Sequence, residues 1–104
     1  MRRVSDEEVA NVLNELDGWT VEEEKWLRKR YRFPEFLKGI AFVNDIAKLS
    51  EEVKHHPFIS IDYKVVTLKL TSWRMKGITD LDLELIQKYD DLYRKQLGSD
   101  AKEG

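Results

Sequence analysis

The chain has 104 residues, and its 18 basic and 20 acidic side chains give a formal net charge of −2. This length predicts one domain over residues 1–104, and the near balance of charge gives no overall attraction to nucleic acid or to an anionic membrane. The absence of cysteine excludes disulfides, thiol catalysis and cysteine-ligated metals, and it fits a cytoplasmic protein. No stretch approaches the roughly 20 apolar residues that cross a bilayer, so we expect a soluble protein.

The first predicted helix begins at a capping box, Ser5-Asp6-Glu7-Glu8. In such a box the serine hydroxyl accepts a hydrogen bond from the Glu8 amide, and the Glu8 carboxylate reaches back to the start of the helix. Apolar residues then follow at helical spacing, and Asp17-Gly18 predicts the end of the helix because glycine tolerates the left-handed conformation. Residues 1–4 are expected to form a loose end.

Two strands are predicted next, over residues 19–22 and 26–33, joined by a turn at residues 23–25 that has no glycine. Alternate residues of a strand face opposite sides, so one face of the second strand carries Trp26, Arg28, Arg30 and Arg32. Three arginines beside an indole that can stack on a base suggest nucleic-acid binding. Such a run is more often a solvated face or a subunit contact, and the acidic net charge also disfavours nucleic acid.

A long helix is predicted over residues 35–54, with Pro34 suited to its first turn. Its apolar residues stand at positions 36, 37, 40, 42, 43, 46, 47, 49 and 53. This apolar stripe is wider than packing against one core requires. We therefore expect one side of the helix to face the core and another to contact a partner subunit.

The remaining chain predicts a hairpin of strands over residues 58–63 and 64–72, then a last helix. That helix is expected to begin at Thr79, with Asp82 completing a second pair of the capping-box kind. The polar tail over residues 98–104 is expected to be loose. The element order α-β-β-α-β-β-α predicts an α+β two-layer sandwich, in which a four-stranded antiparallel sheet carries three helices on one face.

His55 and His56 are the two histidines of the chain, and Pro57 follows them. Histidine is the side chain best suited to giving and taking protons near neutrality. Pro57 disfavours a helical conformation for His56, so the pair falls where the long helix ends and can project into a cleft. From the local sequence alone, simple capping of the helix C-terminus is the stronger interpretation. A zinc site is weaker still, because no third ligand stands out.

Four further residues extend the pattern around the histidines. Glu51 precedes His55 by one helical turn and shares its face. Tyr63 is expected on the third strand, Trp73 just after the fourth, and Asp82 in the first turn of the last helix. The predicted fold lets the exit of the long helix and the end of the fourth strand border one cleft. Each residue also has a structural explanation: Asp82 caps a helix, Glu51 is a solvated charge, and the two aromatic residues pack.

This ordered set resembles the signature of the pterin-4a-carbinolamine dehydratases, also known as dimerisation cofactors of a homeodomain transcription factor. That signature is an acidic residue, three positions, His-His-Pro, an aromatic residue, a second His or Trp, and then Asp. Here it reads Glu51, His55-His56-Pro57, Tyr63, Trp73 and Asp82. The resemblance spans roughly residues 5 to 95 and includes Ser5-Asp6-Glu7-Glu8, Gly18-Trp19 and Gly77-Ile78-Thr79.

The resemblance implies an enzyme that removes the hydroxyl on carbon 4a of 4a-hydroxytetrahydropterin as water. The product is the quinonoid dihydropterin, which a reductase recycles, and no metal or organic cofactor is used. His55 is then a principal proton-transfer residue, and His56 helps to bind and orient the pterin. The resemblance further implies that the substrate is bordered by Pro57, Ser72, Trp73, Arg74 and Met75. Glu51 would orient His55 or fix its tautomer, and Asp82 would accept from a polar pterin edge or hold the cleft together.

Animal members of the family carry a third histidine where this chain has Trp73. An indole can stack on a pterin and donate one hydrogen bond, but it cannot shuttle a proton. We therefore expect activity to depend more heavily on His55 than it does in members with three histidines.

Relatives of this family also form dimers and tetramers, which implies a homodimer or homotetramer here. Animal members bind a transcription factor as well. The alternative function is therefore a non-enzymatic interaction module that binds a protein partner through its helical face. Nothing in the sequence identifies such a partner, and the homeodomain protein is not carried over.

Overall fold

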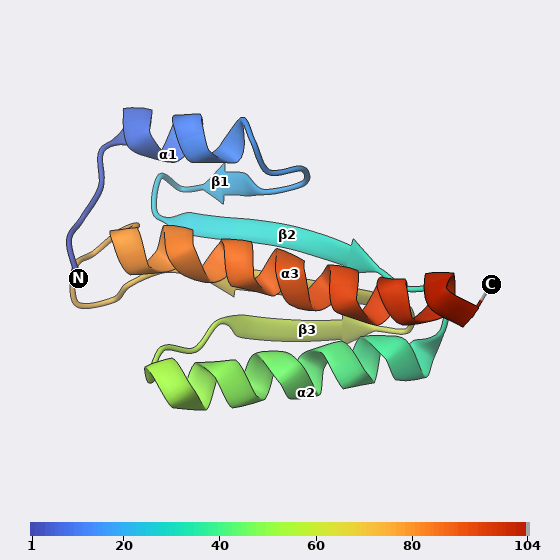
Figure 1. Cartoon of the computed structure of the whole chain (residues 1–104). Coiled ribbons are helices and arrows are strands. Elements are labelled where there is room, and N and C mark those ends of the chain that lie inside the picture. Colours follow the sequence, from blue (N-terminus) through green and yellow to red (C-terminus); the bar gives the residue numbers. More distant parts are fainter. Residues whose placement is uncertain (104) are drawn as a thin grey trace.

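Seven elements follow one another in the predicted order in the computed structural model, which describes the backbone of residues 1–103 and the side chains of residues 1–98. The elements are α1 (Asp6–Leu13), β1 (Thr20–Glu22), β2 (Trp26–Arg32), α2 (Phe36–Val53), β3 (Phe58–Asp62), β4 (Val65–Leu70) and α3 (Asp80–Glu103). They form a sheet covered on one face by the helices, with α1 beside β1 (Figure 1). The predicted α+β two-layer sandwich is confirmed. Within the described residues, no helix combines the length and the apolar content needed to span a membrane.

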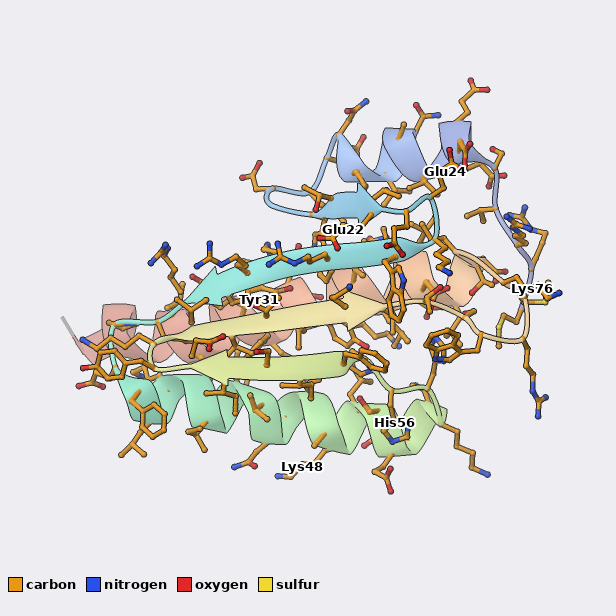
Figure 2. All side chains as sticks on the ribbon, turned by 180° about the vertical axis from the view of Figure 1, so that it is seen from behind. Glu22, Glu24, Tyr31, Lys48, His56 and Lys76 are labelled. Atoms are coloured by element: carbon orange, nitrogen blue, oxygen red, sulfur yellow. The ribbon has the colours of Figure 1, made fainter. Side chains whose placement is uncertain are left out.

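The sheet has the strand order β1-β2-β4-β3, and every neighbouring pair is antiparallel. Its inner face is apolar because alternate residues of the two central strands, Leu27 and Tyr31 in β2 and Val66, Leu68 and Leu70 in β4, are buried. Its outer face carries the arginines of β2, as the alternation predicts. No helix covers this outer face, which faces the viewer in Figure 2 with α3 behind the strands.

Helix α2 buries only part of its apolar stripe. Phe42 and Ile46 are fully buried against the sheet, whereas Phe36 is exposed and Leu37 is 73% exposed. The helix begins one residue later than expected, with Glu35 as its N-cap, so Pro34 precedes the helix instead of occupying its first turn. The excess of apolar residues therefore lies at the surface, near the start of α2.

The turn between β1 and β2 takes a conformation that the sequence left open. Glu23 and Glu24 have positive φ angles of 54° and 61°, and the Lys25 amide donates to the Glu22 carbonyl at 3.2 Å. Two left-handed residues in succession match the twist of an antiparallel hairpin. Two glutamates adopt this geometry without glycine, which explains why no turn signal marks the sequence.

The expectation of a loose end over residues 1–4 is wrong. The Val4 amide donates to the Ile78 carbonyl at 3.0 Å. The Asp80 amide donates to the Arg2 carbonyl, and the Arg2 amide donates to the Asp80 carboxylate, both at 2.8 Å. Val4 is buried, so an apolar contact and a short antiparallel bridge fix this segment beside the start of α3. At the other end, where the sequence predicted a loose tail over residues 98–104, α3 continues to Glu103. Residue 104 and the side chains of residues 99–104 lie outside the described part of the chain.

Candidate active site

The two histidines lie at the junction of α2 and β3, where the helix ends abruptly. Lys54 adopts a left-handed conformation with φ of 56°, and the amides of Lys54 and His55 both donate to the Ser50 carbonyl. This closure turns the chain away from the helix axis. Pro57 is buried, and β3 begins at the next residue. His56 consequently lies at the end of α2, near the start of β3 (Figure 2).

His55 pairs with the buried carboxylate of Asp82. The distance from His55 Nε2 to Asp82 Oδ1 is 2.7 Å, and the two side chains are 14% and 0% exposed. The other carboxylate oxygen accepts from Ser72 Oγ at 2.7 Å and from the Thr79 amide at 2.8 Å. A carboxylate that accepts these bonds requires a donor at Nε2, so the tautomer of His55 leaves Nδ1 as the proton acceptor.

Asp82 performs two tasks at once. With Thr79 it forms the predicted capping box of α3, because the Thr79 amide donates to the carboxylate and the Asp82 amide donates to Thr79 Oγ1 at 3.4 Å. Its other carboxylate oxygen, Oδ1, accepts the hydrogen bond from His55 Nε2. The helix cap that the sequence predicted is present, and the same carboxylate contacts His55.

Ser72 connects the fourth strand to this pair. Its backbone bridges to Gly77, closing a short loop, and its hydroxyl lies 3.3 Å from His55 Nε2 while it donates to Asp82. Within that loop the Met75 amide donates to the Ser72 carbonyl, and Arg74 is exposed. Among the described side chains, Arg74 and Met75 make no hydrogen bond to either histidine.

Glu51 pairs with His56, not with His55 as its position one helical turn earlier suggested. The distance from Glu51 Oε2 to His56 Nε2 is 2.6 Å, and both side chains are well exposed. The i, i+4 relation fails because the left-handed Lys54 ends the helical register before His55. The expectation that Glu51 orients His55 is therefore wrong. The carboxylate that contacts His55 is that of Asp82.

An aromatic cluster of Trp26, Phe58 and Trp73 adjoins the histidines. Ring centroids are separated by 5.1 Å between Trp26 and Trp73 and by 6.2 Å between Phe58 and Trp73. Trp73 follows Ser72 directly and is 61% exposed, so it is available to a ligand. The sequence pointed to Trp73 but missed its two partners. The adjacency of Phe58 to His-His-Pro was the available signal for one, whereas Trp26 joins only through strand pairing.

Tyr63 does not join the site. Residue 63 lies in the turn after β3 with φ of 53°, and its ring stacks on Phe36 at the beginning of α2, with centroids 6.4 Å apart. The expectation that Tyr63 lies on the third strand is wrong because β3 ends at Asp62. The site lies at the other end of the strand, where Phe58 is.

A hollow of about 500 Å³ is lined by Phe58, Ile59, Ser60, Thr67 and Lys69. It shares Phe58 with the aromatic cluster and so adjoins the histidines. Among the side chains of residues 1–98, no group of three or more His, Cys, Asp or Glu residues has the arrangement needed to hold a metal ion.

Comparison with known proteins agrees with this architecture. A family model described as pterin 4 alpha carbinolamine dehydratase matches residues 2–92. A provisionally named pterin-4-alpha-carbinolamine dehydratase of Thermomicrobium roseum is 40% identical over 92 residues, which are 88% of this chain and 98% of the relative. A relative with the same provisional name from Roseiflexus sp. is 39% identical over 90 residues, covering 86% and 96% of the two chains.

A solved structure shares the fold as well. The crystal structure of a transcriptional coactivator/pterin dehydratase from Brucella melitensis superimposes with a TM-score of 0.82 at 26% identity, covering 88% of this chain and 98% of that one. The match of the family model over most of the sequence shows the relationship directly. This chain belongs to the pterin 4 alpha carbinolamine dehydratase family.

Proposed function

We propose that this protein catalyses the dehydration of 4a-hydroxytetrahydropterin to the quinonoid dihydropterin, recycling a pterin cofactor. The observation that supports this most is the hydrogen bond between His55 and the buried Asp82. A carboxylate that fixes the tautomer of an imidazole and stabilises its charged form is a recurrent arrangement for proton transfer. Family membership supplies the substrate class.

The reaction needs one proton removed and one proton delivered. His55 Nδ1 accepts the proton of a ring nitrogen of the pterin, and Asp82 stabilises the imidazolium that forms. The bond between carbon 4a and the hydroxyl then breaks. The hydroxyl takes a proton from His56 and leaves as water, and the carbon–nitrogen double bond of the quinonoid ring forms. Both histidines return to their initial states by exchanging the proton with solvent.

The aromatic cluster and the loop after β4 provide the binding surface in this proposal. Trp73 and Phe58 are exposed and present flat apolar surface to the pterin ring. Pro57 and the Ser72–Met75 stretch border the ring. The elimination of water changes no oxidation state, so we propose that the reaction uses neither a metal nor an organic cofactor.

The test is a dehydration assay with the wild-type protein and the variants His55→Ala, His56→Ala and Trp73→His. Loss of a positioned acid or base lowers kcat by about 10²–10⁴-fold, and we expect His55→Ala to fall in that range. The loss in His56→Ala should be smaller because that ring is exposed, and Trp73→His should be at least as active as wild type. A wild-type protein that does not exceed the spontaneous rate rules out the enzymatic function. If His55→Ala keeps full activity, the mechanism is wrong.

A second candidate function is supported by the exposed apolar start of α2. Leu37 and Phe36 are exposed there, with Tyr63 beside Phe36. Such a surface fits self-association into a homodimer or homotetramer, or a protein partner on the helical face. A solved relative named a transcriptional coactivator/pterin dehydratase adds weight to an interaction module. A chain that assembles with a partner and leaves 4a-hydroxytetrahydropterin unchanged would favour this function over catalysis.

A further inference from the structure

The hollow on the open face of β3 and β4 lies beside the proposed catalytic centre without belonging to it. It is lined by Phe58, Ile59, Ser60, Thr67 and Lys69 and has a volume of about 500 Å³. Phe58 comes two residues after His56, and an extended chain advances about 3.3 Å per residue. A bicyclic ring held at the histidines therefore reaches the edge of this hollow with its substituents.

The walls of the hollow differ in chemistry. Phe58 and Ile59 form an apolar wall, Ser60 and Thr67 contribute hydroxyls, and Lys69 contributes an ammonium group. The ammonium lies 4.8 Å from the centroid of the Trp26 ring, which places the positive charge near the aromatic cluster. One ligand can thus stack on the cluster and carry a polar group toward Lys69.

Strand pairing adds further positive charge beside the hollow. Arg28 stands opposite Lys69, and Arg30 stands opposite Thr67. Glu22 contacts both Arg28 and Lys69, at 3.2 and 3.5 Å, and offsets part of their charge. Arg30 has no carboxylate partner among the described residues. Asp62, whose carboxylate accepts from the Ser60 hydroxyl at 3.2 Å, adds a second negative charge beside the hollow. Arg28, Arg30 and Lys69 still outnumber these two carboxylates, so the surface keeps a positive excess although the whole chain is slightly acidic.

We propose that this hollow is a subsite for an anionic group carried by the side chain on carbon 6 of the pterin. The preferred substrates are then pterins whose side chain ends in a phosphate or a carboxylate. Lys69 and Arg30 bind the anion, and the Thr67 hydroxyl supplies a hydrogen bond, since the Ser60 hydroxyl donates to Asp62 at 3.2 Å. The assignment of a pterin to the neighbouring site rests on the proposed function.

The test measures binding without turnover. Three stable oxidised pterins with a three-carbon side chain, ending in phosphate, carboxylate or hydroxyl, are titrated against the protein while pterin fluorescence is followed. We expect the two anionic probes to bind about tenfold more tightly than the hydroxyl probe at low salt. The anion contacts two cations, each worth up to about 1 kcal/mol, and a tenfold change corresponds to about 1.4 kcal/mol. The preference should shrink as ionic strength rises. The anionic probe with the lower Kd identifies whether the subsite favours a phosphate or a carboxylate.

The variants Lys69→Met and Arg30→Gln test the residues. Each should reduce the preference for the anionic probes several-fold and leave the affinity for the hydroxyl probe unchanged. Lys88→Met is the matched control, because it removes an exposed lysine of α3, on the helical side of the sheet. Circular dichroism reports whether each variant is folded. The preference should survive in the control variant.

Two results would overturn the subsite: equal affinity of wild type for charged and uncharged probes, or a preference that persists in the Lys69→Met/Arg30→Gln double variant. The rate of dehydration of a 4a-hydroxytetrahydropterin whose side chain ends in hydroxyl tests the proposed function separately, since that substrate has no anion for the subsite to bind. Failure of catalysis and failure of the subsite are therefore observed separately.

Discussion

At the scale of single residues, Asp82 accounts for the difference between the two histidines. Its carboxylate is fully buried and accepts hydrogen bonds from His55, Ser72 and Thr79. The partner of His56 is the exposed Glu51, whose contact is screened by water. A contact shielded from solvent orients an imidazole ring more firmly, so the ring of His55 is held in place better than the ring of His56.

Asp82→Asn should therefore lower kcat by about 10²–10⁴-fold, as expected when an imidazole loses the carboxylate that sets its tautomer. The matched variant Glu51→Gln should lower kcat by less than about tenfold, because that contact is exposed. Steady-state dehydration kinetics measure both, and thermal unfolding confirms that each variant is folded. Equal losses in the two variants would contradict the assignment.

A second buried carboxylate, Asp90, has a structural role. Its Oδ1 atom accepts from Trp19 Nε1, Lys29 Nζ and Tyr31 Oη at 3.1, 2.9 and 2.7 Å. The ammonium of Lys29 also lies 4.7 Å from the centroid of the Tyr31 ring. Charge and aromatic packing together fix the inner face of β2 against α3.

Lys29→Met should destabilise the protein by about 3 kcal/mol, because it leaves the charge of Asp90 buried without its cation. Adding Asp90→Asn removes that charge and should restore part of the lost stability. Urea unfolding followed by circular dichroism measures the free energy of unfolding of both variants. A Lys29→Met protein within about 1 kcal/mol of wild type would argue against a buried pair.

At the scale of the elements, the end of α2 sets the positions of the two histidines. Lys54 stands in the left-handed position that usually belongs to glycine, with φ of 56°. For a residue with a Cβ, this left-handed conformation lowers the stability of the fold by about 1–2 kcal/mol. That closure separates His55 from the helix face of Glu51 and turns it toward Asp82.

Lys54→Gly should raise the free energy of unfolding by about 1 kcal/mol while keeping activity, because glycine adopts this conformation without strain. Lys54→Val should lower both stability and activity, since a β-branched residue resists a positive φ. Chemical denaturation and the dehydration assay compare the two variants. A Lys54→Gly protein less stable than wild type would show that the lysine side chain itself contributes more than the conformation costs.

At the scale of the whole molecule, one edge of the sandwich exposes apolar residues. Leu37 is 73% exposed, and Phe36, Ile59, Ile61 and Tyr63 are exposed along the neighbouring part of α2 and β3. A contiguous apolar surface on a small protein usually marks an interaction site. Self-association would cover it.

Leu37→Glu should therefore lower the molar mass measured by light scattering after size-exclusion chromatography. Placing a charge in an apolar contact disfavours association strongly. Val21→Glu is the matched control, because Val21 is also exposed but lies on β1, at the opposite edge of the sheet. A wild-type chain that is monomeric at micromolar concentration would contradict the expectation of a homo-oligomer.

The alkaline stability of the whole molecule should depend on buried tyrosines. Burial raises the pKa of Tyr31 and of Tyr89, and the negative charge of Asp90 raises that of Tyr31 further. Because the pKa values of both tyrosines are higher in the folded state than in the unfolded state, the folded state keeps its full stability below the ordinary tyrosine pKa of 10.0. It loses stability as the pH rises above that value, because the tyrosines then ionise in the unfolded chain first. Each pH unit above that value costs about 1.4 kcal/mol per group.

Tyr89→Phe isolates one of these groups. The Tyr89 hydroxyl is buried and lacks a hydrogen-bond partner among the described residues, so its removal should leave stability at pH 7 unchanged or raise it by about 1 kcal/mol. The variant should then lose less stability than wild type between pH 10 and 11, by about 1 kcal/mol. Denaturation curves at several pH values measure the difference. Parallel losses in the two proteins would refute the buried position of this hydroxyl.

The sequence by itself determined the elements, their order and the candidate centre of the site. Periodicity located each helix and strand, and the capping boxes at Ser5 and Thr79 marked two helix starts correctly. The predicted end of the first helix at Asp17-Gly18 was wrong, because α1 ends at Leu13. These signals are local: each depends on residues within one or two turns of one another. The motif of Glu51, His55-His56-Pro57, Trp73 and Asp82 indicated the family that the comparison then showed.

Only the tertiary structure decided which of these residues meet. His55 and Asp82 are 27 residues apart, and their contact depends on how the end of α2 packs beside the start of α3. In the same packing Glu51 pairs with His56, and Tyr63 lies away from the site against Phe36. Strand pairing brings Trp26 beside Trp73. Local patterns specify conformations within an element, whereas contacts between elements follow from strand order, register and the burial of one shared core.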